Sequence, residues 1–214
     1  MRLRTTPPNH KGYIKGYPDG EFKAKNYDAV STTGTAVING GTFESEKSSG
    51  IYNGGNLTFN NGTVDSYGGI NNYGTLTINN GSITGKNTSA ISTVGKVTVN
   101  GGTILTKSNN SAISVSANTT TINGGNVTSE LGDGIYTSYA YSYGYGSLVV
   151  NGGVVTGHQN GIASYDTSNS IKVTNGNIIG TNAVGVRTNC TSTLLGGVIE
   201  GGTYGVQVTN GTTN

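Results

Sequence analysis

The sequence predicts an all-β protein, a parallel β-solenoid of about eight turns with three short strands in each turn. Two markers repeat along the chain, and the composition suits closely stacked strands. Of the 214 residues 37 are Gly, 10% are charged and 32% are hydrophobic, whereas an ordinary globular domain is about 45–50% apolar. Gly, Asn, Thr and Ser fill the windows in which helix-forming residues would be expected. The composition therefore argues against a helical or doubly wound fold.

Residues 1–30 stand apart from the repeat as an N-terminal segment. They hold all three prolines and half of the twelve basic residues of the chain. Because the first turn of a solenoid exposes strand edges, we predict that this segment caps the first turn, anchors the rod to a larger assembly, or does both. The candidate anchoring residues are Arg2, Arg4, Lys11, Lys15, Lys23 and Lys25.

Residues 31–214 carry the repeat. Its first marker is a pattern of six residues. An apolar residue is followed by Asn, then by Gly or Asn, then by Gly, then by any residue, and last by a second apolar residue. The copies begin at Ile38, Phe59, Ile78, Val99, Ile122, Val150, Val173 and Leu194, and the last two copies are weaker. The Gly three places after each start, from Gly41 to Gly197, occurs in every copy. This predicts a backbone angle that other residues rarely adopt.

The Asn one place after the start recurs in six copies. Asn at the same corner of stacked turns can hydrogen-bond to the copies above and below it. We therefore predict a structural Asn ladder made of Asn39, Asn60, Asn79, Asn100, Asn123 and Asn151.

The second marker is a small residue followed by a β-branched one, from Gly50-Ile51 to Gly205-Val206. It occurs once in every repeat, about midway between two successive copies of the first marker. The two markers divide each repeat into three strands, as in Leu57-Thr58-Phe59, Thr63-Val64-Asp65 and Gly69-Ile70-Asn71. Such a trio cannot bury its inward face alone, so successive turns must stack about 4.8 Å apart.

The copies of apolar-Asn-Gly-Gly resemble the right-handed parallel β-helix superfamily, the scaffold of pectate lyases, bacterial surface proteins and bacteriophage tailspikes. The resemblance covers about residues 36–210. It implies a right-handed coil and identifies the scaffold much more strongly than the activity.

Two acidic residues form a candidate catalytic pair. Glu44 and Asp65 occupy equivalent outward positions one turn apart, near the about 5 Å carboxyl spacing of a retaining glycosidase. The neighbouring loops are short and hold no arginine. We therefore predict that both are solvated surface residues. Glu46 beside Lys86 or Lys107 indicates an exposed strip of ion pairs.

A tyrosine-rich insertion, residues 136–146, makes the repeat that begins at Ile122 the longest of the set. In an extended loop the alternating Tyr139, Tyr141, Tyr143 and Tyr145 would present four rings on one side. Tyr with Ser and Gly is the composition of adaptable binding loops, so we predict contact with a glycan or a protein partner. The alternative is a loop folded back over the rod that covers apolar surface.

Several function classes lack their sequence signals. There is no phosphate-binding loop, nucleophile elbow or zinc spacing, and the chain has one Cys and two His, so we predict no cofactor and no metal. The net charge of +2 gives no reason to expect nucleic acid. No run of about 18 apolar residues and no signal-peptide core is present, which predicts no membrane span and no export signal in this chain.

The sequence therefore predicts a non-catalytic rod on a virion surface or outside a cell. Its N-terminal segment, and a last turn that stops after Gly205-Val206-Gln207-Val208, favour a bacteriophage fibre, spike or decoration protein. We expect it to form homo-oligomers or stack end to end, to join a larger virion or surface assembly, and to contact a host surface or glycan. The alternatives are a bacterial adhesin or filament subunit and a polysaccharide lyase or hydrolase of the pectate lyase type.

Overall fold

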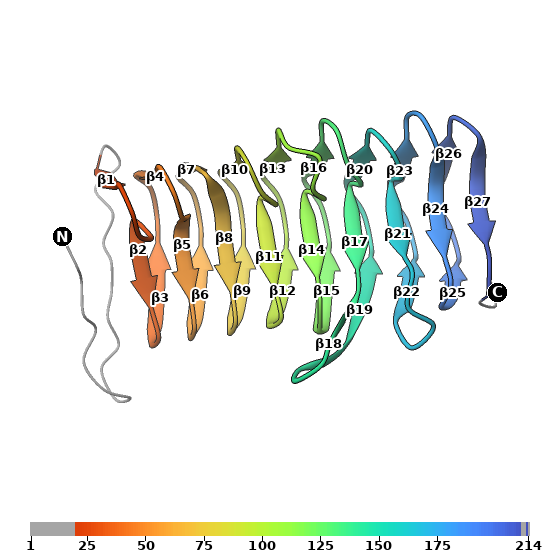
Figure 1. The fold of residues 1–214 in the computed structure, drawn as a ribbon, viewed down its shortest axis with the longest axis horizontal. Coiled ribbons are helices and arrows are strands. Elements are labelled where there is room, and N and C mark those ends of the chain that lie inside the picture. Colours follow the sequence, from red (N-terminus) through yellow and green to blue (C-terminus); the bar gives the residue numbers. More distant parts are fainter. Residues whose placement is uncertain (1–19, 211–212, 214) are drawn as a thin grey trace.

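The computed structural model describes residues 20–210 and 213, which form one elongated rod (Figure 1). This part of the chain contains 27 strands and no helix. Three sheets of nine strands each run along the rod, the third counting β18, which pairs with β19 outside the main ladder. Apart from that pair every ladder is parallel. The all-β parallel solenoid is confirmed.

We name the sheets A, B and C in the order in which the chain crosses them. Sheet A contains β1(Glu21–Ala24), β4(Thr42–Ser45), β7(Thr63–Ser66), β10(Ser82–Gly85), β13(Thr103–Thr106), β16(Asn126–Ser129), β20(Val154–Gly157), β23(Asn177–Gly180) and β26(Val198–Gly201). Sheet B contains β2(Val30–Thr32), β5(Ser49–Asn53), β8(Gly68–Asn72), β11(Ile91–Thr93), β14(Ile113–Val115), β17(Ile135–Thr137), β21(Ile162–Ser164), β24(Val184–Thr188) and β27(Tyr204–Val208). Sheet C contains β3(Thr35–Ile38), β6(Asn56–Phe59), β9(Thr75–Ile78), β12(Lys96–Val99), β15(Asn118–Ile122), β19(Gly144–Val150), β22(Ser170–Val173) and β25(Thr191–Leu194), with β18(Tyr139–Ala140) beside β19.

The rod has about nine turns, one more than the sequence indicates. The additional turn is the first, because β1 pairs in parallel with β4 and Phe22 lies in register with Phe43. Their rings stack with centroids 4.9 Å apart. The repeat therefore starts ahead of residue 30, and Lys23 belongs to a strand of the solenoid rather than to a separate segment.

The core is a set of aligned apolar rows inside the coil. In sheet A one inward row runs from Phe43 through Val64 and Ile83 to Ile178, and all of these side chains are fully buried. Inward and outward side chains alternate along each strand, as the pleat requires. Each buried aliphatic side chain contributes about 1.5–3 kcal/mol, and every turn supplies such side chains from all three sheets.

Glycine forms the corner between sheets C and A. All eight corner glycines from Gly41 to Gly197 have positive φ, between 84° and 128°, which confirms the unusual backbone angle. The corners also stack closely, since a Cβ on Gly102 would lie 2.6 Å from the carbonyl oxygen of Gly81. Both the angle and the spacing exclude a side chain at this position.

The six Asn side chains at the same corner are joined from turn to turn. Each Nδ2 donates to the Oδ1 of the Asn in the preceding turn, from Asn60 to Asn39 through Asn151 to Asn123, at 2.6 to 3.0 Å. Thr174 extends the series by donating its hydroxyl to Asn151 Oδ1 at 2.8 Å. The ladder lies on the surface and ties seven successive turns together.

We expect Gly102→Ala to lower the free energy of unfolding by about 2–4 kcal/mol, because it combines backbone strain with a clash against the preceding turn. Gly101→Asn is the matched control, since Asn61 and Asn80 occupy the equivalent place in two other turns. It should cost less than Gly102→Ala, because Gly101 has no positive φ, although a Cβ there would lie 2.8 Å from the carbonyl oxygen of Asn79. Urea unfolding of the two variants tests this, and equal losses would contradict the role given to the corner glycine.

Candidate functional site

A charged strip lies on the outer face of sheet A at the first turns. Lys23 Nζ lies 3.1 Å from a carboxylate oxygen of Glu21 and 3.5 Å from one of Glu44, and Lys86 Nζ lies 2.9 Å from Asp65. The two candidate catalytic acids are thus each paired with a lysine of a neighbouring turn. Lys86 pairs with Asp65 and not with Glu46, so the strip exists with different partners from those predicted.

The strip is open to solvent. The side chains of Glu44 and Asp65 are each 38% exposed, and the hollow beside them encloses about 370 Å³. A hydrogen bond from the Lys23 ammonium to Glu21, together with the charges of Glu21 and Glu44, holds the pKa of Lys23 above its ordinary value of 10.5. Exposed pairs of this kind contribute about 0–1 kcal/mol each. The arrangement favours a solvated surface.

The tyrosine-rich insertion forms a hairpin, not the extended loop expected from its alternation. β18 and β19 pair in antiparallel fashion, with Tyr139 opposite Tyr145. The amide of Tyr143 donates to the carbonyl of Ala140 at 2.9 Å, and Gly144 takes a φ of 94° to close the turn. The rings of Tyr139 and Tyr145 lie 4.9 Å apart.

The hairpin folds back along the rod toward the N-terminal turns (Figure 1). Near its tip the ring of Tyr143 packs edge-on against Tyr73, with centroids 6.1 Å apart, and Tyr73 lies 5.5 Å from Tyr52. Four rings nevertheless remain exposed, at 41% for Tyr139, 91% for Tyr141, 53% for Tyr143 and 51% for Tyr145. The hairpin is therefore docked on the rod and still presents an aromatic surface.

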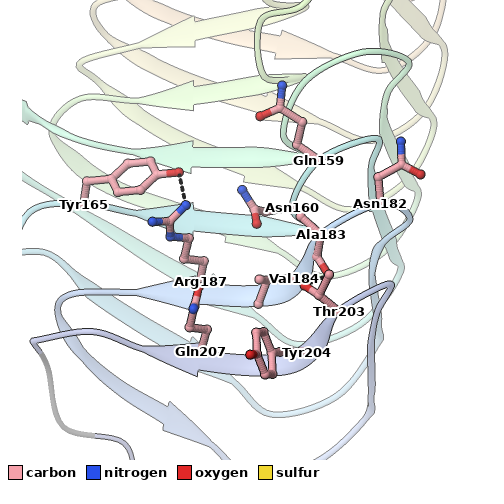
Figure 2. A pocket seen from close by; sticks show the side chains of 10 residues that line it. All are labelled: Gln159, Asn160, Tyr165, Asn182, Ala183, Val184, Arg187, Thr203, Tyr204 and Gln207. Atoms are coloured by element: carbon pink, nitrogen blue, oxygen red, sulfur yellow. Dashed lines mark hydrogen bonds between the residues drawn. The ribbon is translucent and has the colours of Figure 1, made fainter.

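A pocket that the sequence analysis missed opens on the outer side of sheet B, across β21, β24 and β27 (Figure 2). It encloses about 710 Å³. Arg187 and Gln207 are register partners on one side, and Asn160, Val184 and Tyr204 are also among the lining residues. Three consecutive turns build the pocket, so its residues are separated in the chain by one repeat or two.

Aromatic stacking positions the arginine. Ala163 lies in register between Tyr136 and Arg187, and its small side chain leaves space above the strand. The ring of Tyr165 lies 5.8 Å from that of Tyr136 and 5.0 Å from the guanidinium carbon of Arg187. Burial, and secondarily the neighbouring Tyr165, raises the pKa of the Tyr136 hydroxyl above its ordinary value of 10.0.

Of the predicted anchoring residues, Arg2, Arg4, Lys11 and Lys15 lie outside the described residues. Lys23 is in β1 within the charged strip, and Lys25 follows that strand on the exposed rim of the same hollow. Within residues 20–210 and 213 no cluster of three or more His, Cys, Asp or Glu is placed to hold a metal ion. No helix in this part of the chain is long and apolar enough to cross a membrane.

No protein-family model, curated protein or solved structure matches the chain.

We expect Tyr143→Ala to loosen the hairpin without unfolding the rod. The contact with Tyr73 is worth about 0.5–1.5 kcal/mol, so amide hydrogen exchange across residues 136–146 should become about 2- to 10-fold faster while the thermal midpoint stays unchanged. Tyr141→Ala is the control, because this residue is 91% exposed and its aromatic partner is Tyr139 of the same hairpin rather than Tyr73. Equal exchange in both variants would show that the contact does not hold the hairpin.

Proposed function

We propose that the chain is a non-catalytic structural rod of the right-handed parallel β-helix superfamily that presents its tyrosine hairpin to a host surface or a glycan. The proposed setting is a bacteriophage fibre, spike or decoration protein, on a virion or otherwise outside a cell. The observation that carries this proposal is the group of four exposed tyrosine rings on a hairpin docked against a rigid scaffold.

Tyrosine suits such a surface for physical reasons. Its ring stacks on an apolar face while its hydroxyl stays available for hydrogen bonds, and it has little side-chain entropy to lose on binding. Docking of Tyr143 on Tyr73 further limits the freedom of the hairpin before any partner arrives. A preorganised surface of this type binds at lower entropic cost than a free loop.

The charged strip supports the non-catalytic part of the proposal. A glycosidase needs one carboxylic acid with a raised pKa beside a second carboxylate. Glu44 and Asp65 are instead exposed and paired with Lys23 and Lys86. Neither acid lies in the enclosed site that raises the pKa of such a proton donor.

A second candidate is a self-assembling filament subunit or adhesin, favoured by the last described turn. Val206 and Val208 of β27 are 38% and 40% exposed, whereas their partners Val186 and Thr188 in β24 are buried. This face can accept a further parallel turn, either from another copy or from more of the same chain. It is the surface on which end-to-end stacking would be built.

Replacing Tyr139, Tyr141, Tyr143 and Tyr145 together by Ser should weaken the glycan binding that the hairpin supplies. Each lost stacking contact is worth about 0.5–1.5 kcal/mol, so binding to an array of purified bacterial lipopolysaccharides and capsular polysaccharides should weaken at least about 30-fold. The control is Tyr27→Ser with Tyr67→Ser, two exposed tyrosines outside the hairpin. Release of new reducing ends, lost in Glu44→Gln or Asp65→Asn, would instead identify an enzyme.

Light scattering should give a solution mass for the intact chain above that of a single copy. Val206→Lys with Val208→Lys should reduce the mass to that of a monomer, because two charges on an apolar face oppose stacking. Deleting residues 1–19 leaves the first turn whole and tests the contribution of the preceding segment. A monomer at all concentrations for the intact chain would exclude self-assembly.

A further inference from the structure

The pocket on sheet B contains a cation, Arg187, that forms no ion pair within the described part of the chain. Within the described residues no carboxylate lies within ion-pair distance of Arg187, whose only side-chain hydrogen bond is a 3.4 Å contact from Nη1 to the hydroxyl of Tyr165. Its Nε is buried and has no partner. Arginine stays charged at any accessible pH and presents donors that match a carboxylate in a two-point contact. The terminal guanidinium nitrogens therefore keep donors for a ligand, whereas the buried Nε does not reach one.

Two acids on neighbouring segments, Asp133 and Asp166, already accept hydrogen bonds. Asp133 Oδ1 accepts from the backbone amide of Asn160 at 3.0 Å and from its side chain at 2.7 Å. Asp166 accepts from the amide of Ser168 at 2.9 Å. The ion pairs of the described residues are those of Lys23 and Lys86, so neither carboxylate is paired with Arg187 there.

Asn160 supplies an acceptor in the same pocket. The side chain is only 3% exposed, and its bond to Asp133 fixes which end of the amide carries the nitrogen. Its Oδ1 is therefore turned away from that bond and is buried without a donor. A buried polar atom of this kind is unfavourable until a hydrogen bond satisfies it, and a ligand hydroxyl would do so.

The remaining residues that line the pocket are suited to bind a hydroxyl-rich ligand. Figure 2 shows Tyr165 beside Arg187 and Tyr204 below Val184, and the two rings are 42% and 58% exposed. Flat rings pack against the C–H faces of a sugar. Gln207 lines the pocket beside Arg187 and offers both a donor and an acceptor. The volume of about 710 Å³ lies within the usual range of about 300–1,000 Å³ for ligand pockets.

We propose that this pocket binds an acidic saccharide, with Arg187, held in place by the Tyr165 ring, binding the sugar carboxylate, Asn160 Oδ1 accepting from a sugar hydroxyl, and Tyr204 packing on the sugar ring. The site is on a different part of the rod from the tyrosine hairpin and goes beyond the function proposed above. It gives the rod a preference for one chemical class of glycan.

The test is titration calorimetry of the intact chain with oligosaccharides of glucuronic, galacturonic and sialic acid, each beside its neutral counterpart with the carboxyl group reduced to an alcohol. We expect at least one acidic form to bind about 10-fold or more tightly than its neutral form, since a charge-assisted contact is lost on reduction. Arg187→Gln should remove this preference, and Arg187→Lys should restore only part of it.

Lys172→Gln is the matched control, because it removes one exposed positive charge from β22 in sheet C, away from the pocket. It should leave binding unchanged, and an unchanged thermal midpoint for Arg187→Gln would show that the rod stays folded. Absence of binding by all three acidic sugars, or equal binding of acidic and neutral forms, would overturn the proposal. The hairpin variant with four Ser substitutions should keep this binding, which separates the two proposals.

Discussion

The structure depends on one backbone hydrogen bond that recurs at the corner between sheets C and A. The carbonyl of each corner glycine accepts from the amide that follows the corner glycine of the next turn, at 2.8 to 2.9 Å, beginning with Gly20 and Thr42. A Cβ at the corner would lie within 2.9 Å of that same carbonyl. Only glycine therefore allows the bond, and the bond fixes the register of every turn on the one before it.

Because register is fixed at the corner, the sequence repeat predicts the core and most of the fold. Both markers locate the strands of turns two to nine. The first turn escaped prediction because the sequence has Pro18 and Asp19 before Gly20, in place of the Asn-Gly pair. Ala29-Val30 does match the second marker, and Val30 lies in register with Ile51. The second marker alone therefore indicates this turn.

The sequence predicted the candidate sites less completely, because the residues that form each site lie far apart in the chain. Alternating tyrosines indicate an exposed strand, but they do not reveal that Gly144 closes a turn or that Tyr143 reaches Tyr73 in an earlier turn. The pocket is harder still, because Asn160, Arg187 and Tyr204 come from three turns. These residues are close in space only because neighbouring turns are aligned in a particular register. That register cannot be deduced for outward side chains from one sequence.

The division of roles between inward and outward positions explains where function can develop on this rod. An inward side chain must fit the rows above and below it, whereas an outward one is free to vary as long as the strand persists. Ala163 illustrates the consequence. It occupies an outward row whose neighbours are Tyr136 and Arg187, and its small size admits the ring of Tyr165 between them. A larger residue there would leave the solenoid intact and still remove one wall of the pocket, so binding can change on this scaffold without any change in the fold.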